Sequence, residues 1–259
     1  MARIAPALLA VLAIGACVPA PAAASETVKL EASFTPDRLG ASTTIGFGFQ
    51  ISGPGGQAPS PLTRVDLRLP PGVDYLTSSL GLAVCKPAAL VAEGPEGCSP
   101  NSRIGSGSAL VEVPLGSGGG EETPSIQAFM GPPASNGDPV VVFYADGRSP
   151  VNAEVVFEGE LIPGFGPLSS GSLDNAVPLV PGVPEGPDVT IRSVHTTIGP
   201  AGLLYSRRVH GRTVRFHPRG VDVPEHCPRG GFRFAAQFSF ADGSTASATS
   251  SVACPPARR

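Results

Sequence analysis

Glycine and proline interrupt this chain every few residues. With 33 Gly and 30 Pro among 259 residues, the chain leaves little room for long α-helices, because proline breaks a helix interior and glycine weakens it. Alternating or β-rich runs lie between the interruptions, which is typical of short strands joined by turns. They cover residues 28–34, 43–52, 63–69, 106–113, 126–130, 140–144, 152–162, 189–198, 204–209, 213–217 and a final hairpin.

This number of short strands predicts an all-β fold. We expect an antiparallel β-sandwich, built as one large unit or as two closely packed ones, since many short strands separated by turn signals are typical of sandwiches and barrels. At most one short helix is expected, with Pro87 at its first position, "AALVAE" as its body and Gly94 at its end. The sequence "PLGSGGGEETP", residues 114–124, predicts a flexible loop or a hairpin tip.

One Pro/Gly-rich stretch divides the chain. We predict an N-terminal β region over residues 26–165, a linker over 166–187 and a C-terminal β region over 188–259. Val177, Leu179 and Val180 indicate that part of the linker still packs. The C-terminal region offers only five strands, so it forms either a small sandwich or the completion of sheets begun by the first part.

The N-terminus has the pattern of an export signal. Arg3 supplies a positive charge, Ile4–Ala16 an apolar run and "PAAAS" a cleavage site near Ala24, so residues 1–24 read as a signal peptide. No later apolar run reaches the roughly 18 residues that a membrane-spanning helix needs. The sequence "IGAC" also resembles a lipobox, and cleavage before Cys17 would leave a lipid-anchored protein. We therefore expect a secreted protein of the extracellular space or cell envelope, with surface anchoring as the alternative.

Four cysteines follow the signal segment, and an even number in an exported chain indicates disulfides. Three pairings are open, of which Cys85–Cys98 with Cys227–Cys254 is the simplest. His226 beside Cys227 raises the question of a metal site or a nucleophile. No C-x-x-C, H-x-x-x-H or H-E-x-x-H spacing occurs, so we predict no metal, no cofactor and a structural role for Cys227.

The alternating run "FRFAAQFSF", residues 232–240, predicts a strand with one buried face, and "ADG" after it predicts a turn. A two-residue turn would set the phenylalanines opposite Ser and Thr. A three-residue turn with Gly243 in the left-handed conformation sets Phe238 opposite Ala246 and Phe232 opposite Val252, so that apolar residues meet. We predict this second register, which also brings Cys254 within reach of Cys227.

Charge and motifs argue against several function classes. The formal net charge is −3, and this mild acidity argues against nucleic acid as a partner. No G-x-S-x-G elbow, G-x-G-x-x-G motif or phosphate loop occurs. Glu154, Glu158 and Glu160 share strand parity, and neighbours two apart lie at about 7 Å, a distance that glycoside-cleaving carboxylates also span. The simpler interpretation is that Val155, Phe157 and Leu161 face the core and the glutamates face water.

The basic residues cluster in one window. From Val189 to Val221 there are six Arg and no Asp or Glu. Arginine forms bidentate hydrogen bonds with carboxylates and phosphates, so this window predicts a site for an anionic polymer of the cell envelope. The expected contact residues are Arg207, Arg208, Arg212, Arg215 and Arg219. The alternative is an arginine-rich edge strand that resists aggregation and pairs with acids elsewhere in the fold.

Four segments are similar in sequence to segments of other proteins: "TPDRLGASTTIGFGF", "CSPNSRIGSGSALVEV", "VHGRTVRFHPRG" and "CPRGGFRFAAQFSFADGS". They resemble segments of exported proteins from high-GC Gram-positive bacteria that carry no assigned activity. The resemblance implies export and assigns no functional residue. The sequence thus predicts an exported, non-catalytic protein that binds an anionic envelope polymer. The alternatives are a hydrolase using the three glutamates and a purely structural envelope protein.

Overall fold

The computed structural model describes residues 25–73, 79–115, 118–164, 171–182 and 186–255. The predicted signal peptide, including Cys17, lies outside the described residues. Within them no helix is both long enough and apolar enough to cross a membrane.

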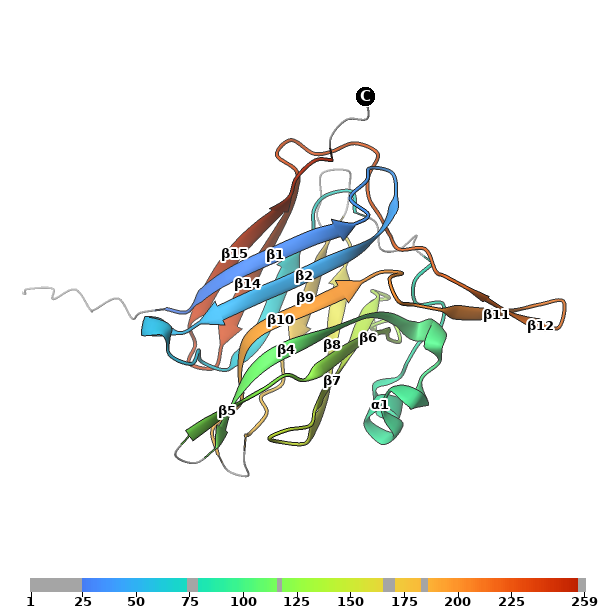
Figure 1. The fold of residues 1–259 in the computed structure, drawn as a ribbon. Coiled ribbons are helices and arrows are strands. Elements are labelled where there is room, and N and C mark those ends of the chain that lie inside the picture. Colours follow the sequence, from blue (N-terminus) through green and yellow to red (C-terminus); the bar gives the residue numbers. More distant parts are fainter. Residues whose placement is uncertain (1–24, 74–78, 116–117, 165–170, 183–185, 256–259) are drawn as a thin grey trace, which may run out of the picture.

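One antiparallel sheet of thirteen strands dominates the structure (Figure 1). Its strands are β1 (Thr27–Thr35), β2 (Ser42–Ser52), β3 (Leu62–Arg68), β4 (Arg103–Leu115), β5 (Gly118–Glu122), β6 (Ser125–Met130), β7 (Val140–Gly147), β8 (Ala153–Ile162), β9 (Ser172–Ala176), β10 (Thr190–Ile198), β13 (Val221–Asp222), β14 (Phe232–Phe240) and β15 (Thr245–Val252). A separate two-stranded sheet contains β11 (Tyr205–Val209) and β12 (Arg212–Phe216).

The main sheet curls into a nearly closed, barrel-like shape. Its strand order is β1-β2-β10-β4-β6-β7-β8-β9-β3-β14-β15, with β5 beside β4 and β13 beside β2. The two ends of this path approach each other, because β1 lies alongside β15 (Figure 1). The predicted antiparallel all-β fold with one short helix is confirmed.

Strands from both sides of the predicted linker belong to this one sheet. β10 lies between β2 and β4, and β14 pairs with β3, so the C-terminal strands complete the sheet that the N-terminal strands begin. β9 lies inside the predicted linker and pairs with β3 and β8. The segment "SLDNA" lacks an apolar alternation of its own, and its two neighbours supply the hydrogen bonds that make it a strand.

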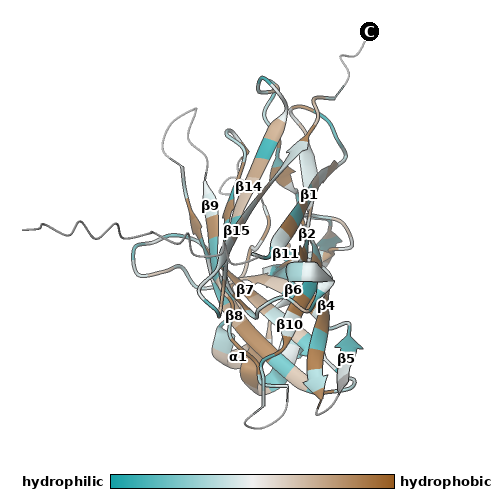
Figure 2. Ribbon diagram, turned by 90° about the vertical axis from the view of Figure 1, so that its left-hand side faces the viewer, coloured by the Kyte–Doolittle hydropathy of each residue, from teal (hydrophilic) through white to brown (hydrophobic). Residues whose placement is uncertain are grey.

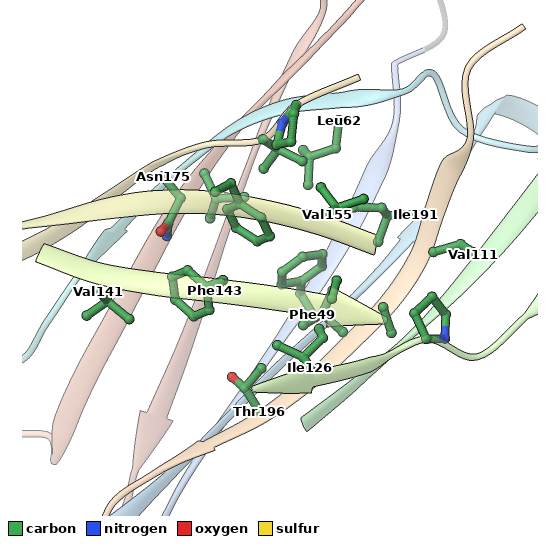
Figure 3. A pocket seen from close by; sticks show the side chains of 18 of the residues that line it. Phe49, Leu62, Val111, Ile126, Val141, Phe143, Val155, Asn175, Ile191 and Thr196 are labelled. Carbon is green, nitrogen blue, oxygen red and sulfur yellow. The ribbon is translucent and has the colours of Figure 1, made fainter. Parts of the chain in front are cut away.

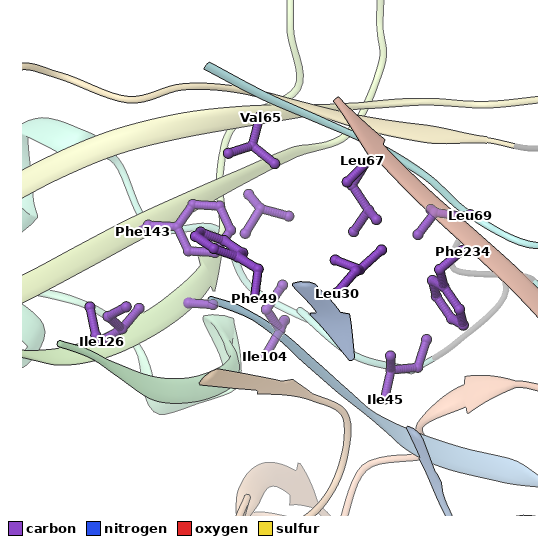
Figure 4. Close-up of a cluster of buried hydrophobic side chains, with 14 of the residues drawn as sticks. Leu30, Ile45, Phe49, Val65, Leu67, Leu69, Ile104, Ile126, Phe143 and Phe234 are labelled. Carbon is purple, nitrogen blue, oxygen red and sulfur yellow. The ribbon is translucent and has the colours of Figure 1, made fainter. Parts of the chain in front are cut away.

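The hairpin of β14 and β15 has the predicted register. Phe238 pairs with Ala246 and Phe232 with Val252, and Gly243 has a φ of +85° in the turn. Hydrophobic and hydrophilic residues alternate along β14 (Figure 2), so its phenylalanines point into the sheet's interior. There Phe34 packs edge-on against Phe232 with 5.2 Å between ring centroids. Figure 4 shows Phe234 in the same core with Leu30 and Ile45.

The helix and both cysteine pairs also match the prediction. α1 spans Pro87–Glu93, and Gly94 follows it with a φ of +65°. Short 3-10 turns cover Pro54–Gly56, Gly94–Gly97 and Pro100–Ser102. The Cα atoms of Cys85 and Cys98 lie 5.3 Å apart, and those of Cys227 and Cys254 lie 5.8 Å apart, each pair joined as a disulfide.

α1 packs against the strands through one fully buried side chain, Leu90, which contacts a small cluster separate from the main core. This cluster contains Cys85, Phe129, Val140, Val142 and Tyr144. The disulfide loop therefore covers one outer patch of β6 and β7.

Candidate functional site

An apolar cavity of about 260 Å³ lies inside the sheet. Most of its lining comes from β2, β3, β4, β6, β7, β8, β9 and β10. Figure 3 shows Phe49, Ile126, Phe143 and Val155 among the side chains around it. Since these strands lie far apart in the sequence, the cavity exists only in the completed sheet.

The size of the inward-facing side chains explains why this space stays open. From Phe143 onward along β7, the cross-strand pairs of side chains that face the interior become smaller from one pair to the next. Phe143 stacks on Phe157 with 5.1 Å between ring centroids, Ala145 pairs with Val155, and Gly147 pairs with Ala153. On β14, in contrast, four phenylalanines fill the interior. One part of the interior is therefore packed, and another is left hollow.

Among the described residues, three polar side chains line the cavity, and two of them have hydrogen-bond partners. The Thr196 hydroxyl donates to the Phe47 carbonyl (3.3 Å), and Glu122 Oε1 accepts from the Ser149 amide (2.9 Å). Asn175 is only 9% exposed, and its Oδ1 has no hydrogen-bond partner among the described residues. A buried polar atom without a partner is costly and calls for an explanation.

Asn175 is held in place by its neighbour on β8. It pairs with Gly159, and a Cβ at Gly159 would collide with Asn175 Oδ1. Leu173 and Asn175 lie on the same face of β9, the face that lines the cavity, and Figure 3 shows Asn175 there. The missing side chain at position 159 therefore makes room for the amide group.

The segment that follows β9 also lines the cavity. Residues 177–181 take part in the lining, and Leu179 among them is 45% exposed. The Val177 amide donates to the Thr63 carbonyl (2.9 Å), and the Val189 amide donates to the Val180 carbonyl (2.8 Å). The chain here passes from β9 to β10, which four other strands separate in the sheet order. Of the three residues expected to pack, Val177 and Val180 are half-buried, whereas Leu179 is exposed.

The three glutamates of the hydrolase alternative lie on the other face of β8. Glu154 and Glu158 are exposed, while the half-buried Glu160 accepts a hydrogen bond from Asn136 Nδ2 (2.7 Å). Glu158 and Glu160 border a depression on the outer surface, together with Asp174, which pairs with Arg64. Val155, Phe157 and Leu161 line the cavity instead. The glutamates thus face away from the cavity.

Four of the five predicted contact arginines lie on the two-stranded sheet, which we call the arginine ribbon (Tyr205–Phe216), and Arg219 follows it in the chain. The arginine ribbon projects away from the barrel-like sheet (Figure 1). All five predicted contact residues are exposed. Arg219 pairs with Asp222 (3.5 Å), and the guanidinium of Arg207 lies 5.2 Å from the centre of the Phe216 ring. In the described part of the chain, Arg207, Arg208, Arg212 and Arg215 form no ion pair.

The base of the arginine ribbon is firmly attached. The fully buried Tyr205 donates its hydroxyl proton to the Arg103 carbonyl (2.6 Å) and accepts from the Gly81 amide (3.1 Å). Burial raises the pKa of Tyr205, so the hydroxyl stays protonated as a donor. The Asn101 side chain donates to the Ser206 carbonyl and accepts from the Ser206 amide. These contacts fix the direction in which the ribbon projects.

His226 is exposed, and Cys227 is held in its disulfide. Across the described residues, no group of three or more His, Cys, Asp or Glu side chains is placed to hold a metal ion.

Fold and cavity define the class of protein: an antiparallel all-β protein with a nearly closed sheet around an apolar space. Comparison with protein-family models, with curated proteins and with solved structures finds no match.

The cavity and Asn175 do not follow from the sequence pattern. Leu173 and Asn175 share strand parity in "SLDNA", but the Pro/Gly-rich residues around this stretch predict a linker and hide the signal.

Proposed function

We propose that this protein is an exported, non-catalytic binding protein that holds a small apolar ligand inside its sheet. The observation that carries the proposal is the apolar cavity inside the sheet, with the unpartnered Asn175 Oδ1 in its wall among the described residues. Ligand sites are typically concave and mostly apolar, with a few polar groups that fix orientation. The two disulfides suit an oxidising extracellular environment.

The cavity volume limits the size of the ligand. A dry protein cavity of about 150 Å³ accepts benzene, and pockets for drug-sized molecules begin at about 300 Å³. The volume of about 260 Å³ lies between these values. It fits a molecule of two fused rings or a short hydrocarbon chain.

We also infer that the sheet is flattened into two facing layers, as in a β-sandwich. Contact between Phe49 of β2 and Phe238 of β14, at 5.1 Å between ring centroids, supports this arrangement where the interior is packed. The smaller residues of β7 and β8 then leave the layers apart around the cavity.

Filling the cavity should weaken ligand binding. We expect Ala145→Leu to lower the affinity for a neutral fluorophore of two fused rings, naphthalene, at least tenfold, because the new side chain occupies the ligand's space. Titration monitored by fluorescence measures this. Ala176→Leu adds the same atoms at an exposed position of β9 and should leave the affinity unchanged. The absence of saturable binding to the unaltered protein, or equal binding by Ala145→Leu, would refute the proposal.

Asn175 should discriminate between ligands by their hydroxyl group. We expect Asn175→Leu to weaken 2-naphthol binding while naphthalene binding stays the same, because only the hydroxyl can donate to Oδ1. The ligand-free variant should also gain about 1 kcal/mol of stability, since a buried group without a partner is removed. Calorimetry measures both effects.

The control for Asn175 is Thr196→Val, which changes a polar lining residue whose hydroxyl already has a partner. Thr196→Val should leave the ratio of the affinities for naphthalene and 2-naphthol unchanged. Equal losses for naphthalene and 2-naphthol in Asn175→Leu would show that Asn175 is no anchor for a ligand.

A further inference from the structure

We propose that the arginine ribbon and the apolar side chains at its base form a docking surface for an anionic lipid surface. This proposal does not depend on a ligand in the cavity. It rests on charge, on exposed apolar residues and on the rigid attachment of the ribbon.

The register of the ribbon distributes its arginines over both faces. Arg207 pairs with Val214, and Arg208 pairs with Thr213. Side chains alternate along a strand, so Arg207 and Arg212 lie diagonally on one face, and Arg208 and Arg215 lie diagonally on the other. Either face therefore presents two positive charges that no acidic side chain in the described residues neutralises.

Exposed apolar side chains lie beside these charges. Eight large hydrophobic residues stand out as exposed in the described chain, and four of them belong to this region. Val214 and Leu204 lie on the ribbon and next to it, and Leu82 and Val84 precede α1; all four are 41–56% exposed. Isolated exposed hydrophobic residues are ordinary, but a group of them suggests an interaction surface.

Hydrogen bonds connect the two parts of this group. The Gly81 amide donates to the Tyr205 hydroxyl, and the Ala83 amide donates to the Asn101 carbonyl (3.3 Å). Asn101 in turn holds Ser206 through both of its side-chain hydrogen bonds. The segment that carries Leu82 and Val84 is thus fixed at the base of the ribbon.

The combination of unpaired arginines with exposed apolar side chains favours a lipid surface over a soluble polyanion. A polyanion can use the arginines but gains nothing from four exposed apolar side chains. At the surface of a bilayer, arginines contact phosphate groups while apolar side chains enter the boundary of the acyl chains. Each arginine near an anionic membrane strengthens binding about fivefold.

Vesicle sedimentation tests the proposal. The full chain should bind vesicles of phosphatidylglycerol and phosphatidylcholine, release them as salt is raised, and ignore vesicles of phosphatidylcholine alone. Replacing Arg208, Arg212 and Arg215 by Ser removes one arginine from one face and two from the other, and should weaken this binding by about 5- to 25-fold, depending on which face contacts the bilayer. A matched variant with Arg38, Arg68 and Arg233 replaced by Ser loses the same charge from exposed positions elsewhere and should bind almost normally. Equal losses in both variants, or no binding by the unaltered protein, would overturn the proposal.

A second variant separates a lipid surface from an anionic polymer. Replacing Leu82, Leu204 and Val214 by Ser should lower vesicle binding at least tenfold and leave retention on immobilised polyphosphate unchanged. Retention on polyphosphate without vesicle binding would overturn the lipid assignment in favour of a polymer. Fluorophore binding should persist in the arginine variant, so failure here is distinguishable from failure of the cavity proposal.

Discussion

Replacing Phe238 by Ala is expected to destabilise the protein by about 3–5 kcal/mol, the usual cost of removing a fully buried phenyl ring. The ring contacts Phe49 at 5.1 Å between centroids, and its strand pairs with both β3 and β15. Its loss leaves a void where strands from both ends of the sheet path meet. Denaturant unfolding measures the change, with the midpoint shifting and the slope unchanged.

The control for this prediction is the preceding residue of β14, Gln237. Gln237 faces outward and is exposed, so Gln237→Ala should change stability by no more than about 0.5 kcal/mol. A cost below about 1.5 kcal/mol for Phe238→Ala would mean that the surrounding side chains collapse into the void, and that this end of the interior is not tightly packed.

Removing the disulfide at the base of the same hairpin is expected to cost about 3.5 kcal/mol. The bond between Cys227 and Cys254 closes a loop with a sequence separation of 27 residues. Cross-linking restricts the unfolded chain by an amount that grows with loop length. The test is denaturant unfolding of a variant with both cysteines replaced by Ser.

The second disulfide provides the comparison. Cys85 and Cys98 are separated by 13 residues, so removing that pair should cost about 3 kcal/mol, slightly less. Intact mass after alkylation should show four cysteines modified only after reduction. Free thiols at Cys227 in protein from an oxidising compartment would contradict the predicted role of this bond.

Local sequence signals predicted the hairpin and the helix well. The phenylalanine alternation admits one register that pairs apolar residues, and this register is the one found. Pro87 and Gly94 set the two ends of α1 through backbone geometry alone. In both cases the residues that determine the structure are close together in the chain. Such local elements can therefore be predicted from the sequence alone.

The cavity was not predictable in the same way. Inward-facing valines, alanines and phenylalanines produce the same alternation whether the space between them is filled or empty. What leaves it open is the pairing of small residues, such as Gly147 with Ala153, and this requires the register of β7 and β8. The arginine window, by contrast, was visible because it is contiguous. The structure adds the projection of the arginine ribbon and the exposed Leu82 and Val84 at its base, which belong to another segment of the chain.

The strand order also determines when the fold can be completed. Phe49 of β2 pairs with Val194 of β10, and Val65 of β3 pairs with Phe238 of β14. Until those distant segments emerge, the first hairpin has an unpaired edge, and the entropy of closing such long loops slows folding. The strands from β4 to β9 follow one another in the chain and pair within the sheet, so they can assemble early, but the nearly closed sheet is completed only once β10 and β14 are available, after nearly the whole chain has been made.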